Sequence, residues 1–307
     1  MNLTRHVYRG EVDLPRILDL VRDQPLTCPH IIDLPWRLSS PIINEGRDAA
    51  LWEDTDGQVV GFAAWQYYWA VLDFFILPDS QQHEMVEREI FAWADTRFRE
   101  RDEERGRPLP YWAEFRDDDQ ERQRLIEAHG FALDGDEEDH HVLLQHSLAE
   151  ITPVPALPAG FTLRTLAGEQ EVAAYTELHR AAFKSDSMTP EWRARTLHMP
   201  QYRPEFDLIA STPDGSLAGF CVGWFDSERH VAQVEPMGVH PRFHQHGLGR
   251  ILLLEMLHRF KKHGADRAFV ETNVSRIPAR RAYESVGFQQ VHTILRKGKW
   301  MSHLRGI

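Results

Sequence analysis

Two short segments of this sequence occur twice at nearly the same spacing, and this repetition limits the folds that the chain can adopt. Residues 54–62 (DTDGQVVGF) match residues 212–220 (TPDGSLAGF) at an offset of 158 residues (219 − 61). Residues 125–131 (LIEAHGF) match residues 282–288 (AYESVGF) at an offset of 157 residues (287 − 130). Two separate matches at nearly one offset predict a tandem duplication, in which each half forms the same supersecondary pattern.

The length and a proline-rich segment indicate where the two halves meet. The chain has 307 residues, which suits two domains of ordinary size, although length alone also allows one large domain. Residues 151–159 contain three prolines, a composition that favours an extended connection over helix or sheet. We therefore predict a first domain at 1–150, a linker at 151–159 and a second domain at 160–307.

Charge and cysteine content exclude several classes of protein. The net charge is -12, and nucleic-acid backbones attract the opposite balance, so neither DNA nor RNA is an expected partner. Only Cys28 and Cys221 occur, one in each half, so neither a disulfide framework nor a thiolate metal cluster is expected. Residues 1–15 show no apolar signal segment, and a reducing cytoplasm fits this composition.

One apolar run, residues 59–77, approaches the length of a membrane span. It carries Gln66 and Asp73, is rich in aromatic residues and lacks a basic cluster at either end. We predict two buried strands with a tight connection there, and no association with a membrane.

Hydrophobic periodicity predicts the same order of elements in both halves: a strand, helices, an antiparallel meander, and then a helix between two further strands. Each half is therefore expected to be a mixed α/β domain, with a mostly antiparallel central sheet flanked by helices. In the first half the expected strands are 3–8, 49–54, 59–65, 71–77, 111–115 and 141–148, with a long helix at 82–104. In the second half the expected strands are 161–166, 206–211, 217–225, 231–239 and 267–272, with helices at 168–183, 190–198, 247–263 and 278–286 and a strand pair after 288.

The segment 239–250 (VHPRFHQHGLGR) follows a predicted strand and opens a predicted helix. Gly247 and Gly249 would let backbone N–H groups approach an anion closely at the helix N-terminus, so a phosphate or pyrophosphate is the natural ligand. A Gly-x-Gly pair alone would also fit an ordinary helix-start turn. The interpretation therefore depends on the surrounding sequence.

That surrounding sequence resembles motif A of the GNAT family of N-acetyltransferases, in which an apolar strand ending in Val-x-Pro precedes Gln/Arg-x-x-Gly-x-Gly/Ala. Residues 283–288 (YESVGF) also resemble the end of that family's motif B, Leu-Tyr-x-x-x-Gly-Phe, in the expected order. His244 occupies the Gln/Arg position, where an imidazole N–H can replace the usual donor. The resemblance implies acetyl-CoA as co-substrate, with its pyrophosphate held by His244, Gln245, His246, Gly247, Leu248, Gly249 and Arg250.

The resemblance also implies how the acetyl group would be transferred. In the family the fourth strand separates from the fifth at a bulge and the pantetheine arm lies in the gap, and Pro236 is consistent with broken pairing there. Glu235 is the expected base, acting directly or through water, with Glu271 in reserve, and Tyr283 is the expected proton donor to the sulfur. Backbone N–H groups near Met237 and Gly238 are the expected donors to the developing oxyanion. The expected contacts with the acetyl-pantetheine part are Met237, Gly238, Val239 and Asn273.

Two groups of three histidines raise the question of a metal site, at positions 240, 244 and 246 and at positions 140, 141 and 146. Neither group has a carboxylate at a recognisable zinc-motif spacing, and the first lies in the predicted phosphate loop. We therefore expect no metal.

The first half lacks a counterpart of the glycine-bearing turn. Residues 77–83 (LPDSQQH) contain no glycine, and Asp79 would repel a phosphate. The first half is therefore expected to be a degenerate copy that keeps the fold without productive binding of the co-substrate. It would either complete the acceptor pocket or stabilise its partner. Two-domain chains of this kind resemble the branch of the family that contains mycothiol synthase.

We therefore predict an acetyl-CoA-dependent N-acetyltransferase that acts on the primary amine of a small molecule by direct attack, with its active site in the C-terminal half. Peptide or protein acetylation is the alternative within the same class, because an acidic chain attracts a basic peptide as well as a polyamine. A non-catalytic acyl-CoA-binding module is the alternative outside it. Nothing in the sequence indicates an oligomeric state.

Overall fold

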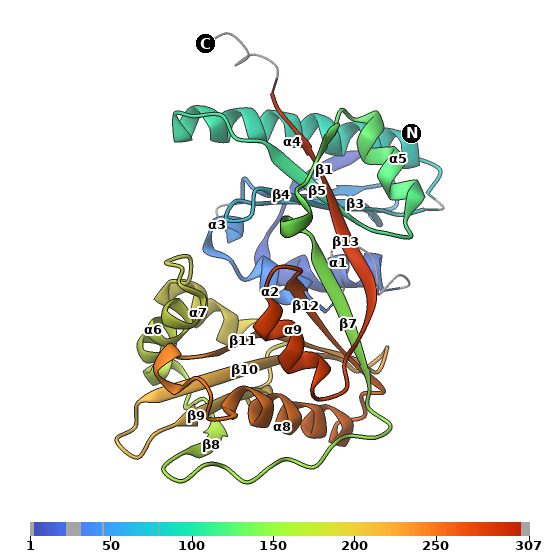
Figure 1. Cartoon of the computed structure of the whole chain (residues 1–307). Coiled ribbons are helices and arrows are strands. Elements are labelled where there is room, and N and C mark those ends of the chain that lie inside the picture. Colours follow the sequence, from blue (N-terminus) through green and yellow to red (C-terminus); the bar gives the residue numbers. More distant parts are fainter. Residues whose placement is uncertain (1–2, 23–31, 45, 79, 302–307) are drawn as a thin grey trace. The chain divides into compact units, whose positions relative to one another are not determined.

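The computed structural model of the chain describes residues 3–22, 32–44, 46–78 and 80–301 (Figure 1). Cys28 and Asp79 lie outside the described residues. The chain divides into two compact units: unit 1 comprises Met1–His140 and Ile294–Ile307, and unit 2 comprises His141–Thr293. Each unit has a hydrophobic core of its own.

Unit 1 contains a sheet with strand order β1-β2-β3-β4-β5-β13, in which neighbours run antiparallel except for the parallel pair β4 and β5. The long helix α4 connects that parallel pair and buries Ile90, Phe91 and Phe98 in the core. The strands are β1 (Thr4–Val7), β2 (Ala49–Glu53), β3 (Val59–Gln66), β4 (Val71–Ile76), β5 (Tyr111–Arg116), β6 (Leu133–Asp134) and β13 (Gln289–Lys299), of which β13 begins in unit 2. The helices are α1 (Leu14–Val21), α2 (Leu34–Leu38), α3 (Pro41–Asn44), α4 (His83–Arg105) and α5 (Gln120–Ala128).

Unit 2 repeats the pattern with strand order β7-β12-β11-β10-β9-β8, in which β11 and β12 form the parallel pair. Helix α8 connects these two strands, as α4 does in unit 1. The strands are β7 (His141–Ser147), β8 (Thr162–Thr165), β9 (Asp207–Ser211), β10 (Leu217–Asp226), β11 (Val231–Val239) and β12 (Arg267–Asn273). The helices are α6 (Val172–Phe183), α7 (Pro190–His198), α8 (Leu248–Lys262) and α9 (Ile277–Glu284).

The predicted fold class is confirmed in both units. The apolar run 59–77 forms β3 and β4, which pair antiparallel around a short turn, so the two predicted buried strands are present. Among the described residues, no helix has the length and apolarity that crossing a bilayer requires. One detail differs, because the strand pair expected after residue 288 is the single strand β13. Residues 289–297 contain no glycine, proline or asparagine that would reverse the chain.

The two compact units do not coincide with the two halves of the sequence. β7 precedes the proline-rich segment but pairs with β12 in unit 2, with His141 opposite Asn273. β13 follows the second half, and its residues from Ile294 to Lys299 pair with β5 in unit 1. The last strand of each sequence repeat therefore contributes to the sheet of the other unit. The predicted domain limits at 150 and 160 describe the sequence repeat and stay a prediction.

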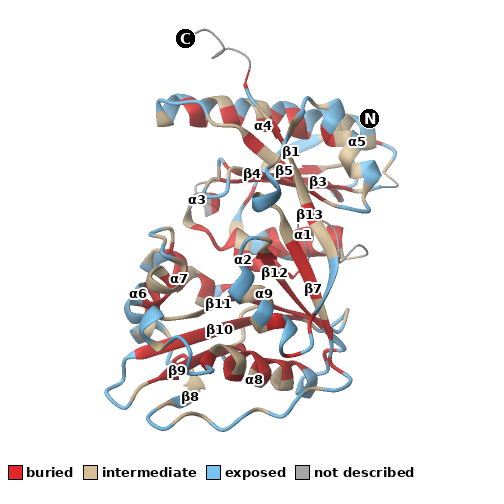
Figure 2. Cartoon of the chain, viewed as in Figure 1, coloured by how far each residue is buried: buried red, intermediate tan, exposed pale blue. Residues whose placement is uncertain are grey.

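Helices cover both faces of the unit 2 sheet, and two glycines allow them to approach it closely. A Cβ at Gly223 would lie 2.5 Å from Cζ of Phe260 on α8, and a Cβ at Gly238 would lie 2.8 Å from Cβ of Ala182 on α6. The buried residues of β10 and α8 form the centre of this core (Figure 2). This packing fixes the start of α8 beside the end of β11, where the sequence places its candidate site.

Candidate active site

The start of α8 offers a row of backbone donors. Gly247 is the residue before the helix and has a φ of +74°, in the left-handed region that glycine adopts without strain. A Cβ at Gly247 would meet nothing within 4 Å, so the backbone conformation and not crowding favours glycine there. Within this fully described segment, the N–H groups from Gln245 to Arg250 donate to no protein acceptor. With the positive end of the helix dipole behind them, they suit a phosphate group.

The polar side chains of this turn are bonded to nearby backbone atoms. His244 Nε2 lies 3.1 Å from the carbonyl oxygen of Val239, and His246 Nδ1 lies 3.0 Å from that of His244. Arg250 donates to the carbonyl oxygen of Ser285 and, at 3.1 Å, to its Oγ, which links α8 to the end of α9. In this conformation, backbone groups rather than imidazoles carry the capacity to bind an anion.

A bulge and a divergence of strands lie beside this helix start. On β10, the residue opposite Met237 is Cys221 and the residue opposite Val234 is Gly223, so Val222 faces both Glu235 and Pro236. The parallel pairing of β11 with β12 covers Val231 to Gln233 on β11 and ends there, although β12 continues to Asn273 along β7. These observations confirm the broken pairing expected at Pro236 and show that β11 leaves β12 after Gln233.

Glu235 lies at this bulge, and its backbone carbonyl accepts a hydrogen bond of 2.7 Å from Nε1 of Trp224. Burial holds the pKa of the Tyr283 hydroxyl well above its ordinary value, and the negative charge of Glu235 raises it further. Burial also raises the pKa of Tyr175 on α6, and Glu235 contributes there too. The structure therefore brings Glu235 and Tyr283, the two predicted catalytic residues, within electrostatic reach of each other, and Tyr283 stays protonated at neutral pH.

The predicted contacts with acetyl-pantetheine follow the bulge or end the next strand. Met237, Gly238 and Val239 are the last residues of β11 and are partly buried. Asn273 ends β12, and its Oδ1 accepts a hydrogen bond of 2.8 Å from the N–H of Ser275. The Asn273 side chain thus starts the turn toward α9, and its contact with a ligand stays a prediction.

Sequence reasoning missed a buried polar network beneath α6 and α7. Arg193 forms an ion pair with Asp207, and both side chains are fully buried. The guanidinium carbon of Arg193 lies 3.7 Å from the ring centroid of Tyr175, and the hydroxyl of Tyr202 donates to Asp207 at 2.7 Å. Nothing in the local pattern distinguishes Arg193 from Arg195, the other arginine of α7, because a helix of mixed charge is normally solvated.

Sequence reasoning also missed a contact of the reserve base. His141 Nδ1 lies 2.7 Å from Oε1 of Glu271, and both side chains are partly buried. The two residues lie on neighbouring strands of unit 2 but are 130 positions apart in the sequence. No local signal could have joined them, because β7 comes from the first sequence repeat.

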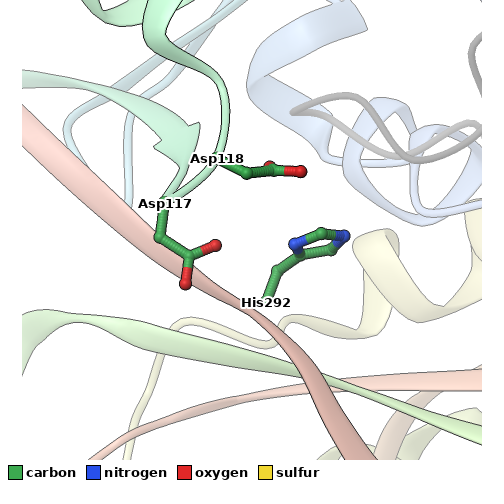
Figure 3. Close-up of side chains that lie close together, drawn as sticks. All are labelled: Asp117, Asp118 and His292. Atoms are coloured by element: carbon green, nitrogen blue, oxygen red, sulfur yellow. The ribbon is translucent and has the colours of Figure 1, made fainter.

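Asp117, Asp118 and His292 are not assigned a metal ion. Figure 3 shows the carboxylates of Asp117 and Asp118 and the imidazole of His292. Asp117 and Asp118 are exposed residues in the turn after β5 of unit 1, and Asp118 accepts a 2.8 Å hydrogen bond from Arg116. His292 belongs to unit 2. Exposed carboxylates of one turn are common without an ion, so these residues carry no functional assignment.

Comparison with known proteins agrees with this geometry. The family model of the acetyltransferase (GNAT) family matches residues 172–288, a segment that runs from the start of α6 through the glycine turn to Phe288. Residues 172–288 thus resemble the GNAT family. Among curated relatives, the mycothiol acetyltransferase of Thermomonospora curvata is 32% identical over 143 residues, which cover 45% of this chain and 48% of the relative. That of Kineococcus radiotolerans is 34% identical over 145 residues, which cover 46% of each chain. The chain thus matches about half the length of these relatives.

Solved structures resemble the chain over nearly its whole length. A tandem GNAT protein from the clavulanic acid biosynthesis pathway superimposes with a TM-score of 0.68 at 18% identity, covering 97% of this chain and 98% of that one. A GCN5-related N-acetyltransferase from Sphaerobacter thermophilus gives a TM-score of 0.61 at 18% identity, with 97% and 95% covered. At this identity the likeness concerns the fold, which is that of a tandem GNAT protein.

Proposed function

We propose that this chain is an acetyl-CoA-dependent N-acetyltransferase whose active site lies in unit 2. The observation that carries the proposal is the combination of two features at one end of β11. The strand diverges from β12 after Gln233, and the helix that follows begins with backbone N–H groups that have no protein acceptor. In this proposal the diverging strands would take the acyl chain, and the helix start would hold the diphosphate.

The residues of unit 2 would then divide the work as follows. Acetyl-CoA would supply the activated acetyl group, with its diphosphate at the N–H groups from Gln245 to Arg250. Glu235 would take a proton from the acceptor ammonium, so that the nitrogen lone pair can form the new bond to the acetyl carbon. N–H groups near Met237 and Gly238 would stabilise the charge that develops on the acetyl oxygen.

Tyr283 would supply the proton that the leaving sulfur requires. Its pKa is held high by burial, so the hydroxyl is protonated and can donate. An ammonium loses two protons when it becomes an amide. Glu235 would take the first before the attack, and the second would leave the nitrogen after the new bond forms and restore the Tyr283 hydroxyl, which has given its own proton to the sulfur. One proton would thus be released overall, from Glu235 to solvent.

The acceptor in this proposal is a small molecule with a primary amine. The matched curated relatives are named mycothiol acetyltransferases, and each match covers less than half of the relative. This supports a small amine over a peptide without specifying which amine. The buried Arg193 network beneath α6 and α7 supports a preformed pocket wall on that side of β11.

The test is the release of free thiol from acetyl-CoA by the purified chain with a panel of amino sugars, amino acids, polyamines and peptides. We expect release that depends on a small amine, together with binding of acetyl-CoA in calorimetry. Turnover of peptides alone would favour peptide acetylation. Binding without turnover of any amine would favour a non-catalytic acyl-CoA-binding module, and the absence of binding would contradict both.

A further inference from the structure

Both units place a carboxylate on each of their two diverging strands. In unit 1 the parallel pairing of β4 and β5 consists of Val71 opposite Trp112, and Asp73 and Glu114 follow two residues later. In unit 2 the last pair of β11 and β12 is Gln233 opposite Phe269, and Glu235 and Glu271 follow two residues later. Residues two apart on a strand share a face of the sheet. In unit 1 the two carboxylates are close, since the charge of Glu114 helps to raise the pKa of Asp73. In unit 2 the register places Glu235 and Glu271 on one face of the sheet, on the two strands that diverge.

A second register supports this correspondence. Gly61 of β3 aligns with Gly219 of β10 in the sequence repeat, so Ala64 aligns with Val222. Ala64 lies opposite Asp73, and Val222 faces the bulge that contains Glu235. Asp73 and Glu235 therefore occupy equivalent places in the two sheets.

In unit 1 a guanidinium lies between the two carboxylates. Arg37 of α2 places Nη1 at 3.0 Å from Oδ1 of Asp73 and Nη2 at 4.0 Å from Oε2 of Glu114. Gln66 donates to the second oxygen of Asp73 at 2.8 Å, and Arg37 also pairs with Asp33. The guanidinium offsets the repulsion between the buried Asp73 and the partly buried Glu114. Unit 1 thus shows that a cation fits between carboxylates placed in this way.

The side chains near Glu235 and Glu271 in unit 2 differ from those in unit 1. Helices α6 and α7 carry Tyr175 and Arg193, and Arg193 forms its ion pair with Asp207. On the far side of β12, His141 of β7 lies 2.7 Å from Glu271 and fixes the direction of its carboxylate. The strand register puts Ile294 of β13 at the equivalent place in unit 1, opposite Arg116, so this imidazole is particular to unit 2.

We infer that the acceptor of unit 2 binds as a cation between Glu235 and Glu271, in the place that Arg37 occupies in unit 1, and that His141 is the positioning residue for Glu271. This inference rests on the proposed function and specifies its substrate class: an amine that arrives protonated and is recognised by its charge. Glu235 takes the proton and Glu271 keeps its negative charge, so the second carboxylate holds the amine while the first activates it.

The probe for this inference is propylguanidine, which copies the end of the Arg37 side chain but is a poor nucleophile. We expect it to bind the full chain in calorimetry and to compete with the amine, not with acetyl-CoA. Glu271→Gln should weaken its binding about tenfold to a hundredfold, which is the usual range for losing a charged hydrogen-bond partner. The matched control variant is Glu114→Gln in unit 1, which should leave the binding of propylguanidine unchanged. The control ligand is propylurea, which carries no charge and should fail to bind.

His141 is tested by its effect on binding and turnover separately. His141→Phe should raise the acceptor KM about tenfold with little change in kcat, because it releases Glu271 without touching the base. His141→Gln keeps an N–H donor and should restore most of the lost affinity. Thermal unfolding of both His141 variants shows whether either has lost stability. A His141 variant that has lost stability is then replaced by His141→Asn.

The outcomes separate this inference from the proposed function. Acetyl transfer with unchanged KM in Glu271→Gln and His141→Phe would overturn the inference and leave the function standing. Propylguanidine binding that depends on Glu271, in a chain that acetylates no amine, would support the cation site and refute the function. Propylguanidine that competes with acetyl-CoA, or binds equally well to Glu271→Gln, would overturn the inference in either case.

Discussion

The two helices that cross between parallel strands, α4 in unit 1 and α8 in unit 2, begin in opposite ways. α8 follows Gly247 in a left-handed conformation and has no acidic residue in its first turn. α4 follows Gln82, has Glu84 in its first turn, and is 23 residues long against 15 for α8. An acid at a helix N-terminus supplies the negative charge that an anionic ligand would otherwise bring. The same fold is thus open to a phosphate in one unit and internally neutralised in the other.

The places where the parallel strands diverge also differ. In unit 1, Arg37 lies between Asp73 and Glu114. Unit 2 has a bulge at Glu235, the buried Tyr283 near it, and His141 beside Glu271. At the position of Tyr283, the sequence repeat places Ile126, which is fully buried. The comparison teaches that a duplicated unit can keep its backbone frame while the side chains at its two diverging strands change completely.

Replacing the acid of each gap tests this comparison most strongly. Glu235→Gln should lower kcat about a hundredfold to ten-thousandfold, because a positioned base typically contributes that much, while acetyl-CoA affinity in calorimetry stays unchanged. Asp73→Asn, at the equivalent place in unit 1, should leave kcat as it is in the wild type. If both variants lose turnover with unchanged melting temperatures, unit 1 takes part in the chemistry and the comparison fails.

A smaller effect is expected at the tyrosine. Tyr283→Phe should lower kcat about tenfold to a hundredfold with little change in acetyl-CoA affinity, because it removes one proton donor to a developing charge. Ile126→Val, at the matching position of unit 1, should change stability only, by about 0.5 to 1.5 kcal/mol. Steady-state kinetics with thermal unfolding measures both. A wild-type rate in Tyr283→Phe would remove this residue from the mechanism.

Local patterns in the sequence were sufficient for most of the fold. The bounds of α7 agree with those expected, since Thr189 caps the helix through a 3.1 Å hydrogen bond and Pro190 begins it. β11 also has its expected limits, from Val231 to Val239. The glycine turn and the bulge at Pro236 lie where sequence and resemblance placed them, because both depend on residues within one short segment.

The rest could not be predicted, because it depends on contacts between distant parts of the chain. The exchange of β7 and β13 between the units leaves no trace in local periodicity, and the predicted boundary at 151–159 follows the repeat instead. The His141–Glu271 pair depends on that exchange. Arg37 likewise reaches Asp73 from a helix 36 positions away, and no spacing rule connects a short helix to an acid in a buried strand.

A last difference between the units is how the stability of each changes as the pH falls. Burial, with the charges of Arg193 and Arg180, lowers the pKa of His179 in unit 2 to about 3, against about 6.5 in an unfolded chain. Burial raises the pKa of Asp73 in unit 1 to about 6, although Arg37 opposes this, against about 3.9 in an unfolded chain. As pH falls from 6.5, the unfolded His179 takes up a proton that the native one does not, so unit 2 loses stability. As pH falls through 6 toward 4, the native Asp73 takes up a proton that the unfolded one does not, so unit 1 gains stability.

Hydrogen exchange resolved along the sequence, at pH 6.5 and at pH 4.5, measures this difference. Amides in the core of unit 2 should lose protection relative to those in unit 1, by at most about 1.4 kcal/mol per pH unit for each group. His179→Asn should flatten the pH dependence of unit 2, and Asp73→Asn should flatten that of unit 1. Equal pH dependence in the wild type and both variants would mean that neither group titrates as its surroundings require. Other acids would then set the acid stability of both units.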